Sequence, residues 1–469
     1  MSYINDARAT DLGYIVNDTR SLVEKWAPLL NAPITDMSTP EFQEKFWKGK
    51  MKEVSYYPDM VQGFDAVKET SFIMPSYNTL EYTRMAYESI RKYYPSNEII
   101  ILDDGSTDGS WESLISTLPM VDTNVQVWHN ATGNILGHTV TYDMGIKMAK
   151  HPLVTIFHSD MVCSKNYLEN MVKHWHPSVV VCATRVEPEG IYPAGHEKIL
   201  KPFGMVWTEF KEKEFEAFVV QEQIDSKDKT TKGIFAPWLM SKADFLLLGG
   251  HDAQHFAPYP EEDADLFLRF HLAGIELIQS RDALCWHWIS RGHRSWAKNG
   301  VGKDDDMFKF YQNRARRNYL RKWHKWMSFD LHHHPVAHKV YDIAFVLHDV
   351  TTVDFLHFVE PWASVVYVDN AAVVAEYIKR EQPTTKLDLT QRVRYYDPAN
   401  LALTEPLNDL VLRFSQKDFM HNGNEASGIL MSLTDILEDG VEDHSVMELG
   451  PFKLTSRVVK DIASTLIKI

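Results

Sequence analysis

From residue 71 onward, short apolar runs alternate with stretches whose apolar positions recur at helical spacing. The stretches 82–93 and 137–149 are predicted helices. The apolar runs, which are predicted strands, cover residues 71–74, 98–102, 125–128 and 153–157. Repetition of strand, helix and strand predicts a mostly parallel sheet with helices on both faces.

The same unit continues toward the C-terminus. Residues 235–288 are expected to complete it, and 304–326 is a predicted helix that leaves it. Before it, Leu22, Trp26 and Leu30 recur at helical spacing. We therefore divide the first part of the chain into an N-terminal helical extension, 1–65, and a larger α/β domain, 66–332.

Residues 333–469 are predicted to form a smaller C-terminal α/β domain. The stretches 343–347, 364–368 and 410–414 are strand-like, and 371–379 is helical. No Gly-rich phosphate loop such as GxGxxG occurs there, so a second nucleotide site is not expected. The role of this domain stays open.

The composition narrows the class of protein. A hydrophobic share of 44% and a charged share of 24% are typical of globular chains. The net charge of −15 provides no global basic field for nucleic acid or an anionic membrane. Cys163, Cys182 and Cys285 are too scattered for a disulfide framework. With no signal-like N-terminus and no apolar span of membrane length, we expect a soluble, cytoplasmic protein.

Polar side chains follow two of the predicted strands. Pro75 and Tyr77 come directly after the strand at 71–74, and Asp103 and Asp104 end the next one. The carboxyl ends of parallel strands line one crevice, so both loops are expected to face the same ligand. A carboxylate can accept the imide N–H of uracil, and an aromatic ring can stack on the base. Both segments also form turns easily, which is the structural alternative.

One further segment suggests a metal, and another contains a histidine whose role its surroundings leave open. Asp160, two residues after His158, follows another predicted strand, where a carboxylate could hold a cation that bridges phosphate oxygens. His287 lies between Trp286 and Trp288. A histidine in such surroundings is more often packed in a core than bound to a metal.

Four acids within five residues open a predicted helix near residue 261. Glu262 and Asp263 are the central pair. Acids are favoured at a helix N-terminus by the helix dipole, so a charged first turn is the simpler interpretation of this segment.

Together, in this order and at these separations, these motifs resemble the family 2 glycosyltransferases of the inverting GT-A type. The resemblance spans residues 71 to about 326 and includes the Gly-rich segment 133–146, the segment 248–252 and the segment 318–323. It implies a GT-A fold, and transfer of a sugar from a nucleoside diphosphate, with UDP favoured, to a hydroxyl group.

The resemblance also implies nucleotide and metal contacts. Pro75, Tyr77 and Asp104 match the nucleoside contacts of the family, with Asp103 beside Asp104. Asp160 matches the last carboxylate of the family's Asp-x-Asp metal motif.

Three histidines bear on the metal. His158 stands at the first acidic position of that motif, a departure that puts the choice of metal in question, although imidazole can ligate manganese. His287 matches the histidine that follows the acidic motif in the family and completes its metal site. His293 is the other candidate for this position. Mn²⁺ or Mg²⁺ is the implied cofactor.

The same resemblance makes Asp263 the catalytic base, with Glu262 as its neighbour. Direct displacement at an anomeric carbon needs a base for the acceptor hydroxyl on one face and a cation for the departing diphosphate on the other. A carboxylate close to a second acid can have its pKa raised toward the operating pH.

The acceptor is not identified by any motif. We place a polysaccharide or glycolipid first, a protein second and hydroxymethylated phage DNA third. The basic aromatic run that includes Arg314, Arg317 and Arg321 keeps nucleic acid open, but the net charge opposes it, and a structural helix is favoured. A homo-oligomer is also left open. The alternative of a different class is a sugar-nucleotide-binding module that has lost catalysis through the altered metal motif.

Overall fold

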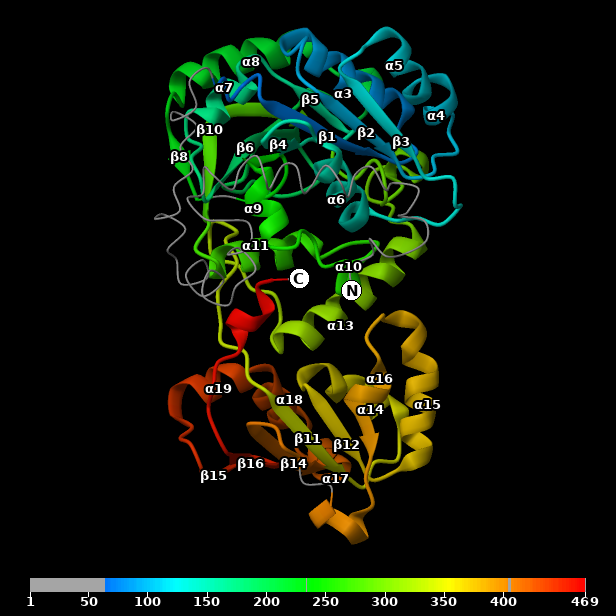
Figure 1. The fold of residues 1–469 in the computed structure, drawn as a ribbon, viewed down its shortest axis with the longest axis vertical. Helices are drawn as coiled ribbons and strands as arrows, with labels where there is room; N and C mark the ends of the chain where they lie inside the picture. Colours follow the sequence, from blue (N-terminus) through cyan, green and yellow to red (C-terminus); the bar gives the residue numbers. More distant parts are fainter. Residues whose placement is uncertain (1–63, 233, 404–405, 469) are drawn as a thin grey trace.

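The structure is a computed structural model that describes residues 64–232, 234–403 and 406–468 (Figure 1). The helical extension expected over 1–65 therefore lies outside the described residues, except for its last two. The described residues form two units, and each unit is a β-sheet with helices on both faces (Figure 1).

The larger sheet has ten strands among the described residues, in the order β3-β2-β1-β4-β9-β6-β10-β5, with β7 beside β6 and β8 beside β10. Its strands are β1 (Thr70–Ser76), β2 (Ile99–Asp103), β3 (Val125–His129), β4 (Leu153–Ile156), β5 (Met161–Cys163), β6 (Val179–Pro188), β7 (Lys198–Lys201), β8 (Thr230–Thr231), β9 (Trp238–Ser241) and β10 (Glu276–His287). The first four coincide with the predicted strands. The predicted α/β class with a mostly parallel sheet is confirmed.

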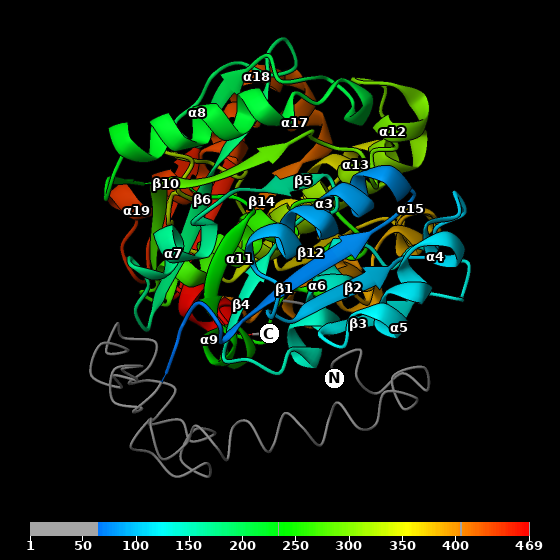
Figure 2. The same ribbon diagram turned by 90° about the horizontal axis from the view of Figure 1, so that it is seen from above.

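Helices cover both faces of this sheet, so its central strands are apolar throughout instead of alternating. In β1, Phe72 and Met74 belong to one hydrophobic core and Ile73 belongs to the core on the opposite face. The helices are α3 (Leu80–Tyr93), α4 (Ser110–Ser113), α5 (Leu118–Val121), α6 (His138–Met148), α7 (Tyr167–Val172), α8 (Glu212–Asp225), α9 (Lys242–Leu247), α10 (Ala253–Phe256), α11 (Glu262–Leu272) and α12 (Trp296–Asn299). Figure 2 shows β1 and β2 side by side at the centre of this unit.

Helix α6 lies unusually close to the sheet. A Cβ at Gly145 would come within 2.4 Å of the Ile73 side chain, so only glycine allows this approach. At the start of the helix, Gly137 has a φ of 75°, and a Cβ there would meet the backbone of Pro258. The two glycines thus seat the N-terminus of α6 at the carboxyl edge of the sheet.

The smaller sheet has the order β13-β12-β11-β14-β16-β15, and its first four strands are parallel. Its strands are β11 (Ile343–His348), β12 (Val365–Val368), β13 (Val393–Tyr395), β14 (Leu410–Ser415), β15 (Val446–Leu449) and β16 (Phe452–Ser456). Its helices are α14 (Val353–Val359), α15 (Ala371–Glu381), α16 (Leu389–Arg392), α17 (Gln416–His421), α18 (Gly423–Met431) and α19 (Leu433–Gly440). A smaller C-terminal α/β unit was predicted from the sequence, and this sheet confirms it.

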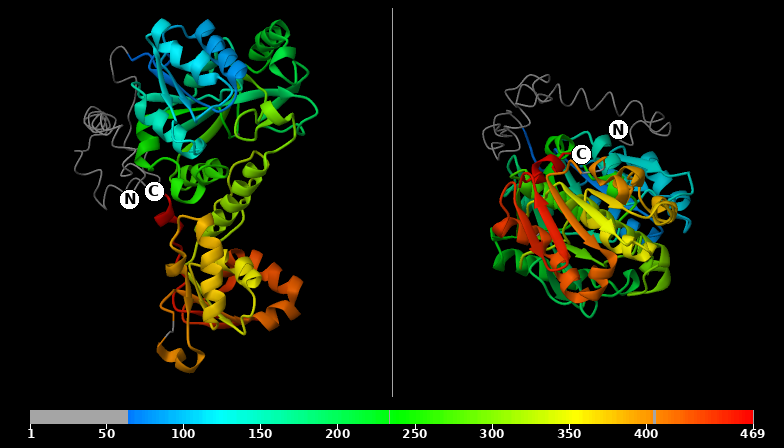
Figure 3. Two further views of the ribbon diagram at one scale, coloured as in Figure 1. Left: turned by 90° about the vertical axis from the view of Figure 1, so that its right-hand side faces the viewer. Right: turned by 90° about the horizontal axis from the view of Figure 1, so that it is seen from below.

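Helix α13 (Asp306–Trp323) connects the two units (Figure 3). Arg321 is buried, and its guanidinium lies 2.9 Å from a Glu360 oxygen and 2.7 Å from a Glu381 oxygen. On the other side, the Lys322 ammonium lies 2.6 Å from an Asp265 oxygen. The helix is therefore bound to both units by buried ion pairs.

The end of the chain returns to the larger unit. Ile467 belongs to one of its cores, and the Ile467 carbonyl accepts a hydrogen bond from Arg269 in α11. The division of the chain at residues 65 and 332 stays a prediction. Among the described residues, no helix combines the length and the apolar character needed to cross a bilayer.

Candidate functional site

The carboxyl edge of the larger sheet carries a cavity of about 220 Å³. Segments far apart in the sequence supply its walls, namely the ends of β1, β4 and β10, the starts of α6 and α11, and the loop after β10. The predicted site residues that line it are Pro75, Tyr77, His158, Asp160, Glu262, Asp263 and His287. Seven of the nine predicted site residues thus meet at one cavity, as expected for an open parallel sheet.

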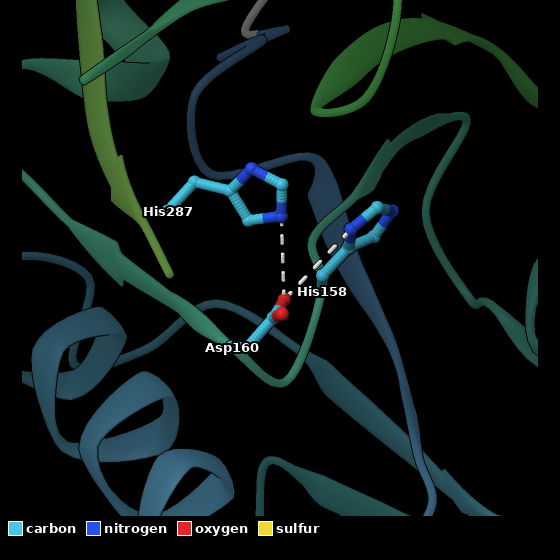
Figure 4. Close-up of side chains that lie close together, drawn as sticks. All are labelled: His158, Asp160 and His287. Carbon is cyan, nitrogen blue, oxygen red and sulfur yellow. Dashed lines mark ion pairs between the residues drawn. The ribbon is translucent and has the colours of Figure 1, made fainter. Parts of the chain in front are cut away.

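His158, Asp160 and His287 form a cluster with ligand atoms that all lie within 4.8 Å of one another (Figure 4). The distance from His287 Nε2 to Asp160 Oδ1 is 3.5 Å, and that from His158 Nδ1 to Asp160 Oδ1 is 4.0 Å. His158 and Asp160 lie in the turn between β4 and β5. His287 ends β10, where it pairs with Met161 of β5, so the strand register brings it next to Asp160.

Charge and burial favour the ligating forms of Asp160 and His158, whereas the pKa of His287 is raised: burial opposes this, but the carboxylates of Asp160 and Glu187 outweigh it. Burial opposes ionisation of Asp160, but the nearby His287 and His158 outweigh it and lower the pKa of this carboxyl group. Burial lowers the pKa of His158 to about 3, so its imidazole is neutral and keeps a free lone pair. An ionised carboxylate and a neutral imidazole are the forms that bind a divalent cation.

Sequence reasoning missed one residue behind this cluster. Glu187 of β6 is 2% exposed, and its Oε1 lies 2.9 Å from His287 Nδ1. The contact arises because β6 and β10 are parallel neighbours with Val186 opposite Trp286. The available signal was a pair of charged residues, Arg185 and Glu187, inside an otherwise apolar run.

Glu262 and Asp263 form the first turn of α11 at the opposite wall of the cavity. Asp263 Oδ1 accepts a hydrogen bond from the Ala264 backbone, and within the described part of the chain the other oxygen has no backbone donor. Burial and the negative charge of Glu262 raise the pKa of Asp263 to about 6. Glu262 faces His138, whose Nδ1 lies 3.6 Å from its Oε1. Although burial opposes it, this contact lowers the pKa of Glu262. The surroundings thus shift the pKa values of these two neighbouring acids in opposite directions: Glu262 is ionised, whereas Asp263 has a pKa of about 6.

The predicted nucleotide contacts divide into two groups. Pro75 and Tyr77 line the cavity, whereas Asp103 and Asp104 are buried behind it. Asp104 accepts hydrogen bonds from the backbones of residues 136 and 137 and from Asn130.

His293 lies between Asp104 and the cavity. Its Nε2 is 3.1 Å from Asp104 Oδ2, and its ring stacks on Tyr77 at a centroid distance of 5.0 Å and an angle of 8°. The two candidates for the histidine after the acidic motif are therefore separated in space: His287 lies beside Asp160, and His293 lies beside Asp104.

The basic side chains of α13 and the residues after it have partners within the protein. Arg317 and Arg321 pair with carboxylates of the smaller unit, and Lys322 pairs with Asp265. Arg316 pairs with Glu261, Arg314 donates to the Ala257 carbonyl and Lys325 pairs with Asp435. These contacts agree with the structural interpretation of this helix.

The carboxyl edge of the mostly parallel sheet thus gathers an acidic turn and a His-Asp-His cluster that could hold a metal ion. The sequence comparison specifies the family. Residues 71–234 match the model of glycosyl transferase family 2. The resemblance to family 2 glycosyltransferases predicted from the motifs is therefore confirmed over residues 71–234.

Two curated relatives are similar over a shorter range. The glycosyltransferase GlyG of Streptococcus pneumoniae is 38% identical over 102 residues, which are 22% of this chain and 33% of GlyG. The uncharacterized glycosyltransferase MG060 of Mycoplasma genitalium is 30% identical over 108 residues, 22% of this chain and 36% of that protein. The chain spans about a third of the length of these relatives.

Solved structures with partial similarity include two glycosyltransferases. One is the mannosyltransferase PcManGT from Pyrobaculum calidifontis in complex with GDP-Man and Mn²⁺, at 14% identity and a TM-score of 0.36, covering 60% of this chain and 73% of that one. The other is GalNAc-T7 with UDP, GalNAc and Mn²⁺, at 14% identity and a TM-score of 0.34, covering 46% and 42%. Similarity at this level adds nothing to the family match.

Proposed function

We propose that this chain is an inverting glycosyltransferase that moves a sugar from a nucleoside diphosphate, which we take to be UDP, to a hydroxyl group of an acceptor. The observation that carries the proposal is that one cavity has Asp263, with its raised pKa, on one wall and the cluster of His158, Asp160 and His287 on another. A single displacement needs these two kinds of group around one reacting carbon.

Asp263 is the base in this proposal. Its carboxylate takes the proton of the acceptor hydroxyl while the acceptor oxygen forms its bond to the anomeric carbon. The bond from that carbon to the diphosphate breaks in the same step, so the configuration inverts. A pKa of about 6 leaves Asp263 ionised at neutral pH and still basic enough to accept the proton. The ionised Glu262 beside it maintains the raised pKa.

Asp160, His158 and His287 would hold the divalent cation, Mn²⁺ or Mg²⁺. The fit rests on the approach of their ligand atoms to within 4.8 Å of one another, and on a donor set of one carboxylate and two imidazoles. When bound, such a cation neutralises the charge that develops on the departing diphosphate.

The nucleoside is assigned to the end of the cavity near Tyr77. The phenol ring offers a stacking face, and Pro75 lines the wall beside it. Asp104, with Asp103 behind it, is the proposed acceptor for the imide N–H of uracil. His293 now occupies both the Tyr77 ring face and one oxygen of Asp104, so binding of the base in this place requires His293 to move.

For the acceptor, we retain the order of polysaccharide or glycolipid, then protein, then hydroxymethylated DNA. The pairing of Arg317, Arg321 and Lys322 with carboxylates of the protein removes the main support for a nucleic acid.

The test uses the purified chain with a panel of nucleotide sugars, with Mn²⁺ and with Mg²⁺. We expect slow release of nucleoside diphosphate from one of them by hydrolysis, and loss of this release in Asp263→Asn. With an acceptor in hand, the anomeric proton couplings of the product, read by NMR, should show inversion. A product of retained configuration, or the absence of both binding and hydrolysis over the whole panel, would overturn the proposal.

A further inference from the structure

The cluster of His158, Asp160 and His287 offers nitrogen as well as oxygen donors, and this donor set affects which cation it binds. We propose that it selects a first-row transition-metal ion, such as Mn²⁺, over Mg²⁺, and that Glu187 is the positioning residue that gives His287 its ligating orientation. The role of the ion in sugar transfer rests on the proposed function, but its binding and selectivity can be measured without any transfer.

The selectivity follows from the donor atoms. The cluster offers two imidazole nitrogens, from His158 and His287, and oxygen only from Asp160. Mg²⁺ binds oxygen ligands in a strict octahedron and gives up its water reluctantly, whereas imidazole suits transition metals. In this cluster the His158 imidazole stands where the family motif has a carboxylate. The cluster therefore carries one negative charge less, which weakens its attraction for a hard cation such as Mg²⁺ more than for a transition-metal ion.

Glu187 controls which nitrogen of His287 is available. His287 Nδ1 lies 2.9 Å from Glu187 Oε1, so when a cation occupies Nε2 the remaining ring N–H is at Nδ1 and donates to this carboxylate. Nε2 is also the atom that faces the cluster, 3.5 Å from Asp160 Oδ1. A carboxylate behind a histidine ligand fixes both its tautomer and its ring orientation, and raises its basicity.

Glu187 is itself held in place by two cationic side chains. Arg185 Nε lies 3.4 Å from one of its oxygens, and Lys198 Nζ lies 3.4 Å from the other. Glu187 is not among the residues whose ligand atoms gather within 4.8 Å, so it acts behind His287 and not as a fourth ligand.

A second buried carboxylate provides a matched control. Glu197 shares the same two cations, at 3.2 Å from Lys198 and 3.8 Å from Arg185, and it is 7% exposed. It makes a further contact with His333 but none with His287. Glu197→Gln therefore disturbs the same charge cluster and leaves His287 with its partner.

The experiment measures Mn²⁺ binding to the full chain by the loss of the free-ion signal in electron paramagnetic resonance, followed by competition with Mg²⁺. We expect the unmodified chain to keep most of its Mn²⁺ in about a hundredfold excess of Mg²⁺. Glu187→Gln should weaken Mn²⁺ binding by about 10- to 100-fold, as for other outer-sphere partners, while Glu197→Gln stays close to the unmodified chain. Thermal unfolding without metal verifies that each variant is folded.

His158→Asp supplies an independent test if Glu187→Gln does not fold. This change restores a second carboxylate, and we expect Mg²⁺ to compete far better. The ¹⁴N couplings of bound Mn²⁺ should fall from two imidazoles to one. Equal competition by Mg²⁺ in the unmodified chain would overturn the selectivity, and equal losses in Glu187→Gln and Glu197→Gln would overturn the role of Glu187. If Mn²⁺ binds as described but no sugar is transferred, the proposed function fails and this inference stands.

Discussion

The two sheets of this molecule differ in what the polar residues at their carboxyl edges contact. Both contain parallel strands with polar residues at their carboxyl ends, which is where ligands bind in open α/β sheets. At the larger sheet, Asp160 and Asp263 face a cavity. At the smaller sheet, Asp369 follows β12, but its two oxygens accept hydrogen bonds from the backbones of Asp349, at 2.6 Å, and Val350, at 3.2 Å.

Other polar groups at the smaller edge are bonded in the same way. The Tyr396 hydroxyl lies 2.6 Å from His348 Nδ1, and Gln416 Oε1 accepts the Thr351 backbone N–H at 2.8 Å. Both oxygens of Asp369 thus bind the backbone of a neighbouring loop, as those of Asp104 do at the larger edge, whereas Asp160 and Asp263 face the cavity. The comparison teaches that topology locates the edge where chemistry can occur, and that the hydrogen-bond partners of each side chain decide whether it does.

Loss of the base should have the largest effect at the larger edge. Asp263→Asn keeps the shape of the side chain and removes its basicity. We expect turnover to fall on the order of 10² to 10⁴, with the affinity for the nucleotide sugar nearly unchanged, because the acceptor and not the donor contacts this carboxylate. Steady-state rates together with calorimetric titration of the donor measure the two quantities separately. An equal loss of donor affinity would place Asp263 at the donor and not at the acceptor.

The pH dependence of turnover should reflect the ionisation of Asp263. The role proposed for Asp263 needs its carboxylate ionised, and its pKa is raised to about 6, so turnover should fall about tenfold per pH unit below 6 and reach a plateau above it. Since the charge of Glu262 contributes to this raised pKa, Glu262→Gln should move the acid limb to lower pH. Turnover profiles at saturating donor measure the limb. A shift to higher pH in Glu262→Gln would contradict the assignment of the limb to Asp263.

Much of the larger domain could be predicted from the sequence. The runs that became β1, β2 and β4 are buried on both faces, and such strands show as continuous apolar segments. The site residues at their ends followed from the rule for parallel sheets, and the family resemblance added His287, which composition alone would have left as a packed histidine.

The contacts that the sequence did not predict depend on partners far along the chain. Glu187 reaches His287 only through the register of β6 and β10. The basic run of α13 contains no acid of its own, yet Arg321 and Lys322 find carboxylates on other elements. No local pattern contains a register or a packing partner, so neither contact could be derived before the fold was known.

The base end of the cavity offers a smaller and two-sided test. Tyr77→Ala removes the stacking face, and aromatic pairs are worth about 0.5–1.5 kcal/mol, so UDP should bind roughly 2- to 10-fold more weakly. His293→Ala removes a side chain that covers the same ring and one oxygen of Asp104, so UDP should bind more tightly by a similar factor. Titration calorimetry compares the two variants. Weaker binding in both would make His293 a nucleotide contact and not a competitor.

The smallest effect on transfer is expected at the edge of the smaller sheet, from Asp369→Asn. An asparagine has one acceptor oxygen in place of two, so one of the backbone N–H groups of Asp349 and Val350 loses its partner. This should cost about 1–3 kcal/mol of stability, seen as a lower thermal midpoint. Turnover and donor affinity at a temperature where the variant is folded should equal those of the unmodified chain, because both oxygens of Asp369 serve the fold. A loss of transfer without a loss of stability would mean that this carboxylate meets a ligand, and the contrast between the two edges would then be wrong.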